Sequence, residues 1–508
     1  MLLDIPASIV PDSTAVIDSE GRSESYHELR AAAGRAAALL GALGVAPGDR
    51  VGLFATNSLE YVEALLGVSI LGAVAVPMNF RARGPELAHL LADSGTKALL
   101  AESRYEELVA EAAPPDLPVV YLDTDYPGRR DQHDSVDLVA DVDDRDIGII
   151  LYTSGTTSLP KGVMLTHGAL TGYVINRTEC ADGTDRGRTL LSAPLHHIAA
   201  VSSLLSSLYG GRSVVVMPQF DAEAWLEAVE RHRVSHAFLV PTMLARIIAM
   251  PAVTERDLSS LEFVTYGAAP MPPSVIRKAI DVMPAVGFTG AYGQTETTST
   301  VTVLDPDDHR MEGDPATVER KQRRLASVGK AVGDVELRVI DEQGKEVPSG
   351  EVGEVQIRTF RTMSGYWGAN AGATGKTVEA DGWLHTGDLG YLDEDGYLFL
   401  GGRAGGLIIR GGENISPEDV EAAFYDHPDV VEAGVVGIPD EEWGETVAVA
   451  VVPRAGSGLT ADDVLAFAAE RLPGYKRPET VLVLEALPRT STGKLVRREL
   501  LPMFQKES

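Results

Sequence analysis

Apolar runs with helical spacing alternate with short apolar runs typical of strands along the first part of the chain. Residues 23–44, SESYHELRAAAGRAAALLGALG, form an Ala- and Leu-rich run that ends in glycine, with Ser25 and Glu28 placed as a capping box. The segment DRVGLFATNS (49–58) follows and predicts a strand. The same order returns in YVEALLGVSILGAVAVPMN (61–79). This alternation predicts a parallel α/β sheet with covering helices.

The pattern changes at about residue 331. GDVELRVIDEQGKEVPSGEVGEVQIRT (333–359) has two strand-like runs with Gly and Pro between them, which predicts a small β-rich section. At 508 residues the chain is long enough for about three packed units of roughly 150 residues each.

The last hundred residues have the pattern of a separate α+β unit beyond the glycine-rich segment 401–406. Ser416 is placed to cap a helix, Pro417 takes its first position, and Asp419 completes a capping box. The strand TVAVAVVP (446–453) follows, and a second capped helix begins at Thr460 with Asp463. We therefore predict an α/β fold with a large N-terminal domain, residues 1–402, and a small mobile C-terminal domain, residues 403–508.

Charge and composition limit the partners. The 44 basic and 74 acidic residues give a formal net charge of −30, which repels nucleic acid and anionic lipid. No run reaches about 18 apolar residues, and the first residues lack the basic region and apolar core of a secretory signal. We expect a cytoplasmic protein with no nucleic-acid partner and no integral membrane association. The single cysteine, Cys180, excludes an internal disulfide and a cysteine-cluster metal site.

The stretch LYTSGTTSLPKG (151–162) directly follows an apolar run and has the chemistry of a phosphate-binding loop. Backbone N–H groups of a tight Gly, Ser and Thr loop can converge on an anion, and Lys161 adds a positive charge. The loop is not the Walker pattern, because Pro160 precedes the lysine and Gly162 follows it. This argues against a P-loop kinase or ATPase.

The string TSGTTSLPKG resembles the phosphate-loop signature of the acyl-adenylate-forming superfamily, which includes acyl-CoA synthetases, peptide-synthetase adenylation domains and firefly luciferase. It differs from the usual pattern at Ser158, where glycine is common. The resemblance extends over nearly the whole chain, because further motifs follow in the family's order. They are TYGAAPMP (265–272), AYGQTE (291–296), WLHTGDLG (383–390), GGENISPEDVE (411–421) and PRTSTGKLVRREL (488–500).

The resemblance implies ATP and Mg²⁺ as cofactors and a first step in which a carboxylate attacks the α-phosphorus of ATP, giving acyl-AMP and pyrophosphate. Such a step needs positive charge and fixed donors more than an acid or a base. The family pattern implies that Thr295 faces the α-phosphate and that Glu296 holds Mg²⁺, with an oxygen ligand that suits this ion. The residues expected to hold the nucleotide and its phosphates are Thr153, Ser154, Gly155, Thr156, Thr157, Lys161, Gly267, Ala268, Ala269, Tyr292, Gly293, Asp388 and Arg403.

Lys494 in STGKL is the residue expected to carry the adenylation step. The resemblance implies that it reaches from the C-terminal domain into the cleft and bridges the carboxylate and the α-phosphate as charge develops. With Lys161, Thr295 and Glu296 it completes the expected catalytic set.

The second half-reaction is expected to use coenzyme A after rotation of the C-terminal domain. Gly411, Gly412 and Glu413 are implied to border the pantetheine tunnel, and Lys476 in LPGYKRP is the expected partner of an acidic group of CoA. Gly405 and Gly406 replace a pair that carries a charged hinge residue in the family. We expect that rotation persists with weaker control of its two poses, because glycine permits backbone rotation but offers no side chain.

The substrate pocket is implied to lie near APLHHIAAVSS (193–203), VPTMLARI (240–247) and TYGAAP. His197 matches the residue that often gates carboxylate entry, His196 stands where an aromatic residue is more usual, and Gly267 leaves room for the acyl group. No dedicated Arg or Lys for a second carboxylate stands out, which favours a fatty or aryl monocarboxylic acid.

Three other functions stay open. One is an adenylation enzyme that loads the phosphopantetheine of a carrier protein. Another is a luciferase-like oxygenase, and the third is a catalytically impaired acyl-adenylate-binding protein, suggested by Ser158 and the two glycines. The expected partners are a small carboxylic acid, ATP and CoA, and a homodimer also stays open.

Overall fold

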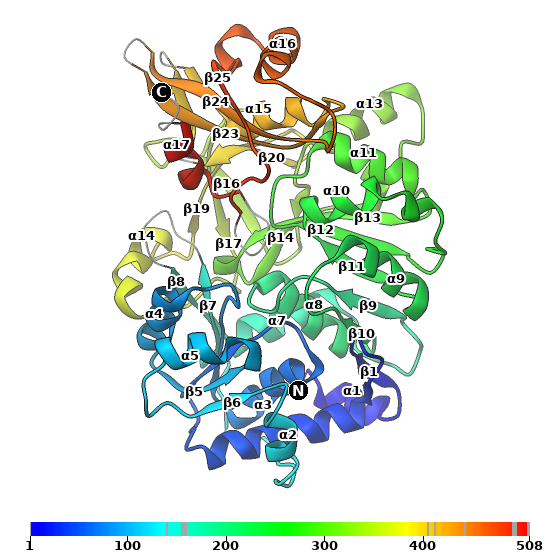
Figure 1. The fold of residues 1–508 in the computed structure, drawn as a ribbon, viewed down its shortest axis with the longest axis vertical. Helices are drawn as coiled ribbons and strands as arrows, with labels where there is room; N and C mark the ends of the chain where they lie inside the picture. The colour runs from blue at the N-terminus through cyan, green and yellow to red at the C-terminus, as the bar shows by residue number, and fades with distance from the viewer. Residues whose placement is uncertain are drawn as a thin grey trace.

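The computed structural model describes residues 2–138, 141–153, 160–403, 406–410, 413–440, 443–489 and 495–504. Three sheets lie before residue 404 and one follows it (Figure 1). The predicted mixture of parallel α/β units, a small β-rich section and a C-terminal α+β unit is confirmed.

One sheet of the N-terminal part has seven strands within the described residues, in the order β18-β8-β7-β4-β3-β5-β6. Strands β3 to β7 run parallel, whereas β8 and β18 are antiparallel to their neighbours. Its strands are β3 (Arg50–Phe54), β4 (Val74–Pro77), β5 (Thr96–Ala101), β6 (Val119–Tyr121), β7 (Ile147–Thr153), β8 (Lys161–Thr166) and β18 (Gly365–Tyr366).

The second sheet has nine strands in the part of the chain that the structure describes, in the order β15-β14-β13-β12-β11-β9-β10-β1-β2. Strands β1 and β9 to β13 are parallel, so their carboxyl ends lie at one edge. The strands are β1 (Thr14–Ile17), β2 (Ser23–Ser25), β9 (Arg188–Leu191), β10 (Ser213–Val216), β11 (His236–Leu239), β12 (Phe263–Gly267), β13 (Gly287–Gln294), β14 (Ser299–Leu304) and β15 (Lys330–Ala331).

Helices cover these two sheets. The capping box at Ser25 is confirmed at the start of α2, and Gly67 of α3 permits close packing because a Cβ there would lie 2.6 Å from the Cβ of Ala36. These helices are α1 (Asp4–Ile9), α2 (Tyr26–Ala42), α3 (Leu59–Leu71), α4 (Gly84–Ser94), α5 (Glu106–Ala112), α6 (Tyr126–Arg130), α7 (His167–Arg177), α8 (Ile198–Tyr209), α9 (Ala222–His232), α10 (Pro241–Ala249), α11 (Pro273–Val282), α12 (Pro306–His309), α13 (Pro315–Arg324) and α14 (Thr374–Thr377).

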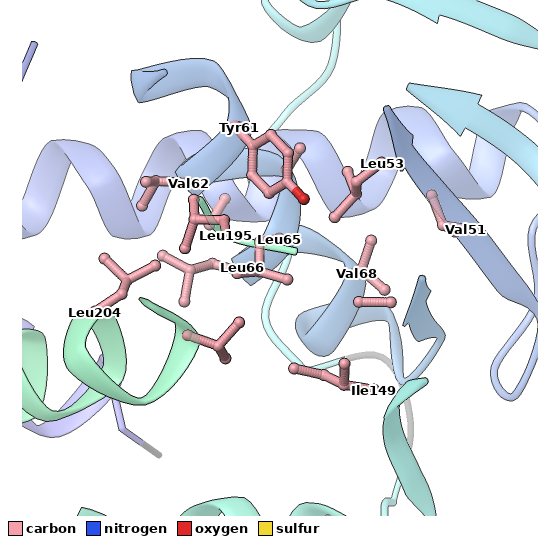
Figure 2. Packing of buried hydrophobic residues seen from close by; sticks show 14 of the residues in the cluster. Val51, Leu53, Tyr61, Val62, Leu65, Leu66, Val68, Ile149, Leu195 and Leu204 are labelled. Atoms are coloured by element: carbon pink, nitrogen blue, oxygen red, sulfur yellow. The ribbon is translucent and has the colours of Figure 1, made fainter. Parts of the chain in front are cut away.

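The main hydrophobic core joins the two sheets. Figure 2 shows Tyr61 and Leu65 of α3 packed with Leu53 of β3, Ile149 of β7 and Leu204 of α8. All five side chains are at least 95% buried. Burial of this apolar surface fixes one sheet against the other, so the ends of β7 and β13 keep a defined separation.

The β-rich section is an antiparallel sheet of β16 (Glu336–Ile340), β17 (Gly353–Arg358), β19 (Leu384–Leu392) and β20 (Leu398–Arg403). It lies between the two larger sheets and the C-terminal unit in Figure 1. The strand, turn and strand predicted for residues 333–359 are β16 and β17.

The C-terminal unit is built on a sheet of five strands among the described residues. It contains β21 (Ile408–Arg410), β22 (Glu413–Ile415), β23 (Val430–Asp440), β24 (Gly444–Pro453) and β25 (Thr480–Val483), with helices α15 (Pro417–Phe424), α16 (Ala461–Arg471) and α17 (Arg497–Phe504). The change of sheet falls between β20 and β21, close to the predicted boundary after residue 402. That boundary and the rotation of the unit stay predictions.

The two predicted capping boxes of this unit have different outcomes. Thr460 and Asp463 form both bonds of a capping box at α16, as predicted. At α15, Ser416 accepts a hydrogen bond from the backbone N–H of Asp419, but the reciprocal bond was wrongly predicted. The Asp419 carboxylate instead accepts from Lys476 Nζ at 3.0 Å, because an ammonium group is a stronger partner than a backbone N–H.

Candidate active site

The predicted phosphate loop connects two antiparallel strands. Thr153 ends β7 and pairs with Lys161, the first residue of β8, so both stand at the mouth of the loop. Lys161 Nζ lies 5.2 Å from the centroid of the Tyr366 ring on β18, the strand beside β8. The loop residues Ser154, Gly155, Thr156, Thr157 and Ser158 lie outside the described residues.

Residues 292–297 form the carboxyl end of β13 and the short 3-10 helix η3 (Thr295–Thr297). The pairing of β13 with β14 shifts register between Tyr292 and Gly293. A Cβ on Gly293 would lie 1.9 Å from the Ser299 carbonyl oxygen, so only glycine fits here. The pairing continues after this irregularity to Gln294, opposite Ser299, and Thr295 and Glu296 follow in η3.

Glu296 is held by the segment that leads to β18. Its carboxylate oxygen Oε1 accepts a hydrogen bond of 3.0 Å from the Tyr366 hydroxyl, and its carbonyl accepts one of 2.8 Å from the Met363 N–H. Tyr366 therefore connects Glu296 of η3 with Lys161 of β8, and one cluster contains an acidic and a basic side chain.

The chemistry of this cluster fits a magnesium nucleotide. No group of three His, Cys, Asp or Glu side chains suited to a metal occurs among the described residues. Mg²⁺ is commonly bound through one or two carboxylates together with substrate phosphates and waters, so a single carboxylate near a phosphate loop is sufficient. Glu296 is the residue that would hold the ion, and Lys161 would bind the phosphates.

Asp388 on β19 is fixed from β13. Its oxygen Oδ2 accepts 2.6 Å and 2.8 Å hydrogen bonds from the Tyr292 hydroxyl and Gln294 Nε2, and only 7% of the residue is exposed. Gln294 Nε2 also donates to the Thr386 carbonyl at 3.0 Å. The register of β19 and β20 places Arg403 directly opposite Asp388. Nothing further is described of the Arg403 side chain.

The carboxyl end of β12 lies beside β13, the strand that holds Asp388. Gly267 pairs with Ala291 of β13, and a Cβ on Gly267 would approach the Ala291 carbonyl oxygen to 2.3 Å. Ala268 has a φ of 66°, a left-handed conformation that is rare for a residue with a side chain. Such strain is common where a backbone is shaped for a ligand. Ala269 follows and is half-buried.

His197 stands at the start of α8 and is half-buried. The ring of the buried His196 lies 4.2 Å from the His197 ring and meets Phe80 edge to face at 5.5 Å, all between centroids. Burial, together with the nearby Arg81 charge, lowers the pKa of His196 to about 3. His196 is therefore neutral at physiological pH and supports His197 from the core. Ser202 of α8 donates to Ser299 Oγ at 3.0 Å, which ties this helix to the turn after η3.

The C-terminal unit carries a second polar surface around Lys476. Arg410 donates to the carbonyl oxygens of Tyr475 and Arg477 at 3.2 and 3.3 Å, and its guanidinium lies 5.8 Å from the centre of the Trp443 ring. Trp443 and Tyr475 are 45% and 43% exposed. We call Arg410, Trp443, Tyr475 and Lys476 the aromatic–basic surface. Gly411, Gly412, Gly405 and Lys494 lie outside the described residues, as does the side chain of Glu413.

The structure thus places Thr153 and Lys161 at adjoining ends of β7 and β8, with Tyr292 near the end of β13, Glu296 in η3 and Asp388 within β19. The described contacts of Lys476 are in the C-terminal unit. Sequence reasoning missed Gln294, Tyr366, Arg410 and Trp443. Gln294 lies inside the AYGQTE motif, where a side chain able to donate two bonds was a signal. Tyr366 had no signal, because its role depends on β18 pairing with a strand 200 residues earlier.

A cavity of about 600 Å³ lies elsewhere, at the carboxyl ends of β3 and β10. None of the predicted site residues is among its lining residues. Two ion pairs lie among its lining residues: Arg22 donates to Glu60 at 2.7 Å, and Arg104 pairs with Glu102. This cavity is therefore a polar crevice between the sheets and has no part in the candidate site.

Comparison with known proteins agrees with this arrangement. A family model described as "AMP-binding enzyme" matches residues 5–367, and one described as "AMP-binding enzyme C-terminal domain" matches residues 419–494. The chain is similar to a feruloyl-CoA synthase of Amycolatopsis sp, with 38% identity over 98% of this chain and 97% of the relative. It is also 35% identical to the fatty acid–[acyl-carrier-protein] ligase ScoC of Streptomyces coeruleorubidus, over 98% and 95% of the two chains.

Solved structures are similar over their whole length. ATP-bound MatB from Rhodopseudomonas palustris has a TM-score of 0.87 at 28% identity, covering 100% of both chains. The o-succinylbenzoate CoA synthetase MenE from Bacillus subtilis, in complex with its acyl-adenylate intermediate, has a TM-score of 0.85 at 30% identity, covering 98% of this chain and 97% of that one. No helix in the described part of the chain is long and apolar enough to span a membrane.

Proposed function

Because the chain belongs to the AMP-binding enzyme family of acyl-adenylate-forming enzymes, we propose that it converts a fatty or aryl monocarboxylic acid into its CoA thioester. The resemblance inferred from the motifs is confirmed, and the chain is an AMP-forming acid–thiol ligase. The acid, the use of CoA as acceptor and the role of each residue are proposals.

The observation that carries the proposal is the cluster of Lys161, Tyr366 and Glu296 beside Asp388 and Tyr292. In the first half-reaction a carboxylate oxygen attacks the α-phosphorus, a new P–O bond forms, and the bond to pyrophosphate breaks with its electron pair on the leaving group. Lys161 would stabilise the departing phosphates, and Glu296 would hold the magnesium ion, which would supply positive charge to them. Asp388 and Tyr292 bind the nucleoside.

Lys494 is proposed to neutralise charge that develops between the substrate carboxylate and the α-phosphate. The cluster of described residues offers Lys161 at the phosphate loop, but a second cation is needed at the reacting atoms, because three negatively charged groups meet there. The C-terminal unit supplies it by reaching the body of the protein. A contact between the two parts is present: Arg246 of α10 lies 3.7 Å from Glu432 of β23.

In the second half-reaction a thiol gives up its proton to solvent and attacks the acyl carbonyl, forming a C–S bond while the C–O bond to AMP breaks with its electron pair on the phosphate oxygen of AMP. The aromatic–basic surface supports CoA as the thiol. An exposed indole can stack on a purine, and cations beside it can bind phosphates. Trp443, Arg410 and Lys476 carry these groups on one unit of the fold, where Arg410 pairs with Glu479 and Lys476 with Asp419.

The proposal of a monocarboxylic acid is supported by the basic residues near the predicted pocket. Segments 193–203 and 265–272 contain no Arg or Lys, and segment 240–247 contains only Arg246. Arg246 lies near Glu432 of the C-terminal unit and is 61% exposed. A second carboxylate of a substrate would therefore lack a cation from these segments, and its burial would be unfavourable.

A second candidate is loading of an acyl-carrier protein, which the 35% identity with the ligase ScoC favours. The chemistry is the same, but the thiol then arrives on a protein. Such an acceptor has no adenine, so stacking on Trp443 would contribute nothing. Dependence on Trp443 therefore distinguishes the two acceptors.

The test is a two-way panel of acids and acceptors. The acids are ferulate, cinnamate, benzoate, indoleacetate, octanoate and palmitate, each with ATP, Mg²⁺ and either CoA or a holo acyl-carrier protein. We expect mass spectrometry to find an acyl-CoA for at least one acid, with pyrophosphate formed in equal amount. Thioester on the carrier alone would support the second candidate. If none of the acids in the panel supports pyrophosphate formation, both candidates are contradicted.

A further inference from the structure

The turn directly after Glu296 has an unfavourable backbone. Thr298 and Ser299 have φ values of 50° and 78°, and neither is a glycine. For Thr298 this left-handed conformation crowds the β-branched side chain against the backbone. The side chains of Thr297 and Thr298 are fully buried. Such a conformation persists only where the surrounding structure imposes it.

Arg361 is the group that imposes it. This arginine is 0% exposed, and its guanidinium donates to the carbonyl oxygens of Thr297 at 3.1 Å, Thr298 at 3.3 Å and Thr300 at 3.3 Å. Carbonyls on successive residues of an extended strand point in alternate directions, so three of them can meet one guanidinium only in a turn such as this.

Asp334 supplies the opposite charge. Arg361 Nε donates to its Oδ2 at 2.5 Å, and Nη2 lies 3.3 Å from its Oδ1. Partial burial alone would raise the pKa of Asp334, but the bond and the charge of Arg361 lower it below its usual value. The pair is thus ionised at neutral pH. The Tyr173 ring lies 5.3 Å from the guanidinium carbon and closes the other side.

The backbone of the Arg361 segment also forms hydrogen bonds with the turn after Glu296. The Thr298 hydroxyl donates to the Arg361 carbonyl at 2.7 Å, and the Met363 N–H donates to the Glu296 carbonyl at 2.8 Å. Tyr366, five residues after Arg361, donates to the Glu296 carboxylate. One short segment therefore holds both the backbone and the carboxylate of the proposed metal-binding residue.

A stabilising role alone does not explain this arrangement. A buried ion pair contributes little to stability compared with apolar residues of similar size, because both charges lose their hydration. The guanidinium instead places its donors on the residues that immediately follow Glu296, where a shift of the turn moves the carboxylate.

We propose that Arg361, with Asp334, is a positioning residue for adenylation that keeps Glu296 in the orientation that binds the metal of the nucleotide. The proposal rests on the proposed function, because it assumes that Glu296 holds that ion. It predicts that loss of the guanidinium changes the requirement for Mg²⁺ more than the affinity for the acid.

The test uses the full chain with Arg361→Met, which keeps much of the volume, and Arg361→Lys, which keeps the charge but loses the planar fork. Arg358→Met is the matched control. Arg358 lies three residues earlier and pairs with Glu336 through bonds of 3.0 and 2.5 Å at the exposed side of β17. The readouts are kcat for pyrophosphate formation, KM for the acid, the half-saturating Mg²⁺ concentration, and amide hydrogen exchange of residues 293–300.

For Arg361→Met we expect the half-saturating Mg²⁺ concentration to rise at least about fivefold and kcat to fall roughly 10- to 100-fold, as for a misplaced catalytic group. KM for the acid stays within about twofold, and exchange of residues 293–300 becomes faster. Arg361→Lys should give values of these readouts between those of the wild type and Arg361→Met, and Arg358→Met should match the wild type. A lower Tm with unchanged kcat and Mg²⁺ requirement would overturn the proposal and leave a purely structural role.

One further variant and one further readout cover the cases in which Arg361→Met does not fold or the wild type forms no pyrophosphate. If Arg361→Met does not fold, Asp334→Asn removes the counter-charge from a residue that is 17% exposed; a raised Mg²⁺ requirement supports the proposal, and an unchanged one overturns it. If the wild type forms no pyrophosphate with any acid, the proposed function fails. The Arg361 role is then decided by the Mg²⁺-dependent part of the Tm increase with ATP, which Arg361→Lys must reduce.

Discussion

The candidate site on the body of the protein and the aromatic–basic surface of the C-terminal unit are built differently. On the body, Asp388 and Glu296 are held by side chains from segments about 70 to 100 residues away, and Asp388 is nearly buried. On the C-terminal unit, Trp443 and Tyr475 are largely exposed, and the Lys476 ammonium pairs with the 54%-exposed Asp419 side chain.

The difference follows from what each region is proposed to bind. Charge that develops at a phosphorus atom is best stabilised by groups whose orientation is fixed before the reaction. A thiol ligand with a long flexible arm instead needs a surface that binds its nucleotide, and exposed aromatic and basic groups can stack on the base and pair with the phosphates. Under the proposed function, the body is organised for adenylation and the C-terminal unit for delivery of the acceptor.

The largest effect is expected at Lys494, the side chain of the C-terminal unit that is proposed to act in adenylation on the body of the protein. Lys494→Ala should lower the rate of acyl-AMP formation by roughly 10²- to 10³-fold, because a cation at the reacting atoms is lost. Thioester formation from preformed acyl-AMP should stay within a few fold. Rapid-quench measurement of both half-reactions checks this, with Lys345→Ala in an exposed turn as control. Equal losses in both steps would break the proposed division.

A smaller effect is expected at Asp388. Asp388→Asn removes the charge that accepts from Tyr292 and Gln294. KM for ATP should rise roughly 10- to 150-fold, which corresponds to about 1.5–3 kcal/mol for a hydrogen bond to a charged group, whereas KM for CoA should not change. Steady-state kinetics with Asp381→Asn, an exposed control in the preceding turn, make the comparison. A change in KM for CoA alone would assign Asp388 to the second half-reaction and contradict its proposed role in ATP binding.

Trp443→Ala provides the reciprocal measurement on the C-terminal unit. KM for CoA should rise roughly five- to tenfold if the indole stacks on adenine, and acyl-AMP formation should not change. Val483→Ala, an exposed apolar residue on the same sheet, is the control. An unchanged KM for CoA would favour a carrier protein as acceptor or another position for the nucleotide.

The smallest effect concerns the packing that keeps the body rigid. Burial lowers the pKa of His196 from 6.5 to about 3, so the unfolded chain takes up a proton first as the pH falls. Stability from this residue is complete above about pH 6.5 and is lost as the pH decreases toward 3. Between pH 7 and 5.5 the loss is about 1 kcal/mol, or about 1 °C in Tm for a chain of 508 residues.

The variant His196→Phe should show a correspondingly smaller fall in Tm over that range in a thermal-unfolding series. His27→Phe, at an exposed position, should keep the wild-type pH dependence. If His196→Phe has the same pH dependence as the wild type, His196 is not the buried neutral group described.

The sequence predicted those parts of the fold that depend on neighbouring residues. The capping boxes at Ser25 and Thr460 and the strand pair of the β-rich section are local patterns, and each is present. The Asp419 half of a capping box was wrong because its partner, Lys476, lies 57 residues later.

The candidate site shows the same limit. Tyr292, Glu296 and Asp388, which the motifs named, lie in one region, because Tyr292 and Gln294 of β13 contact Asp388 of β19 and Glu296 follows in η3. Their roles stay predictions. Tyr366 and Arg361 were missed because their importance comes from contacts about 60 to 70 residues away in sequence. Buried charges in irregular segments have no periodicity, so only the folded structure identifies them.

The most direct test of the whole account is a single-turnover experiment with excess enzyme, ATP, Mg²⁺ and the best acid of the panel. Without CoA, the account predicts rapid formation of one equivalent of enzyme-bound acyl-AMP and one of pyrophosphate. Addition of CoA should then convert the acyl-AMP quantitatively into acyl-CoA and AMP. Formation of ADP and phosphate, or thioester without an acyl-AMP intermediate, would contradict the central claim that the chain activates its acid by adenylation.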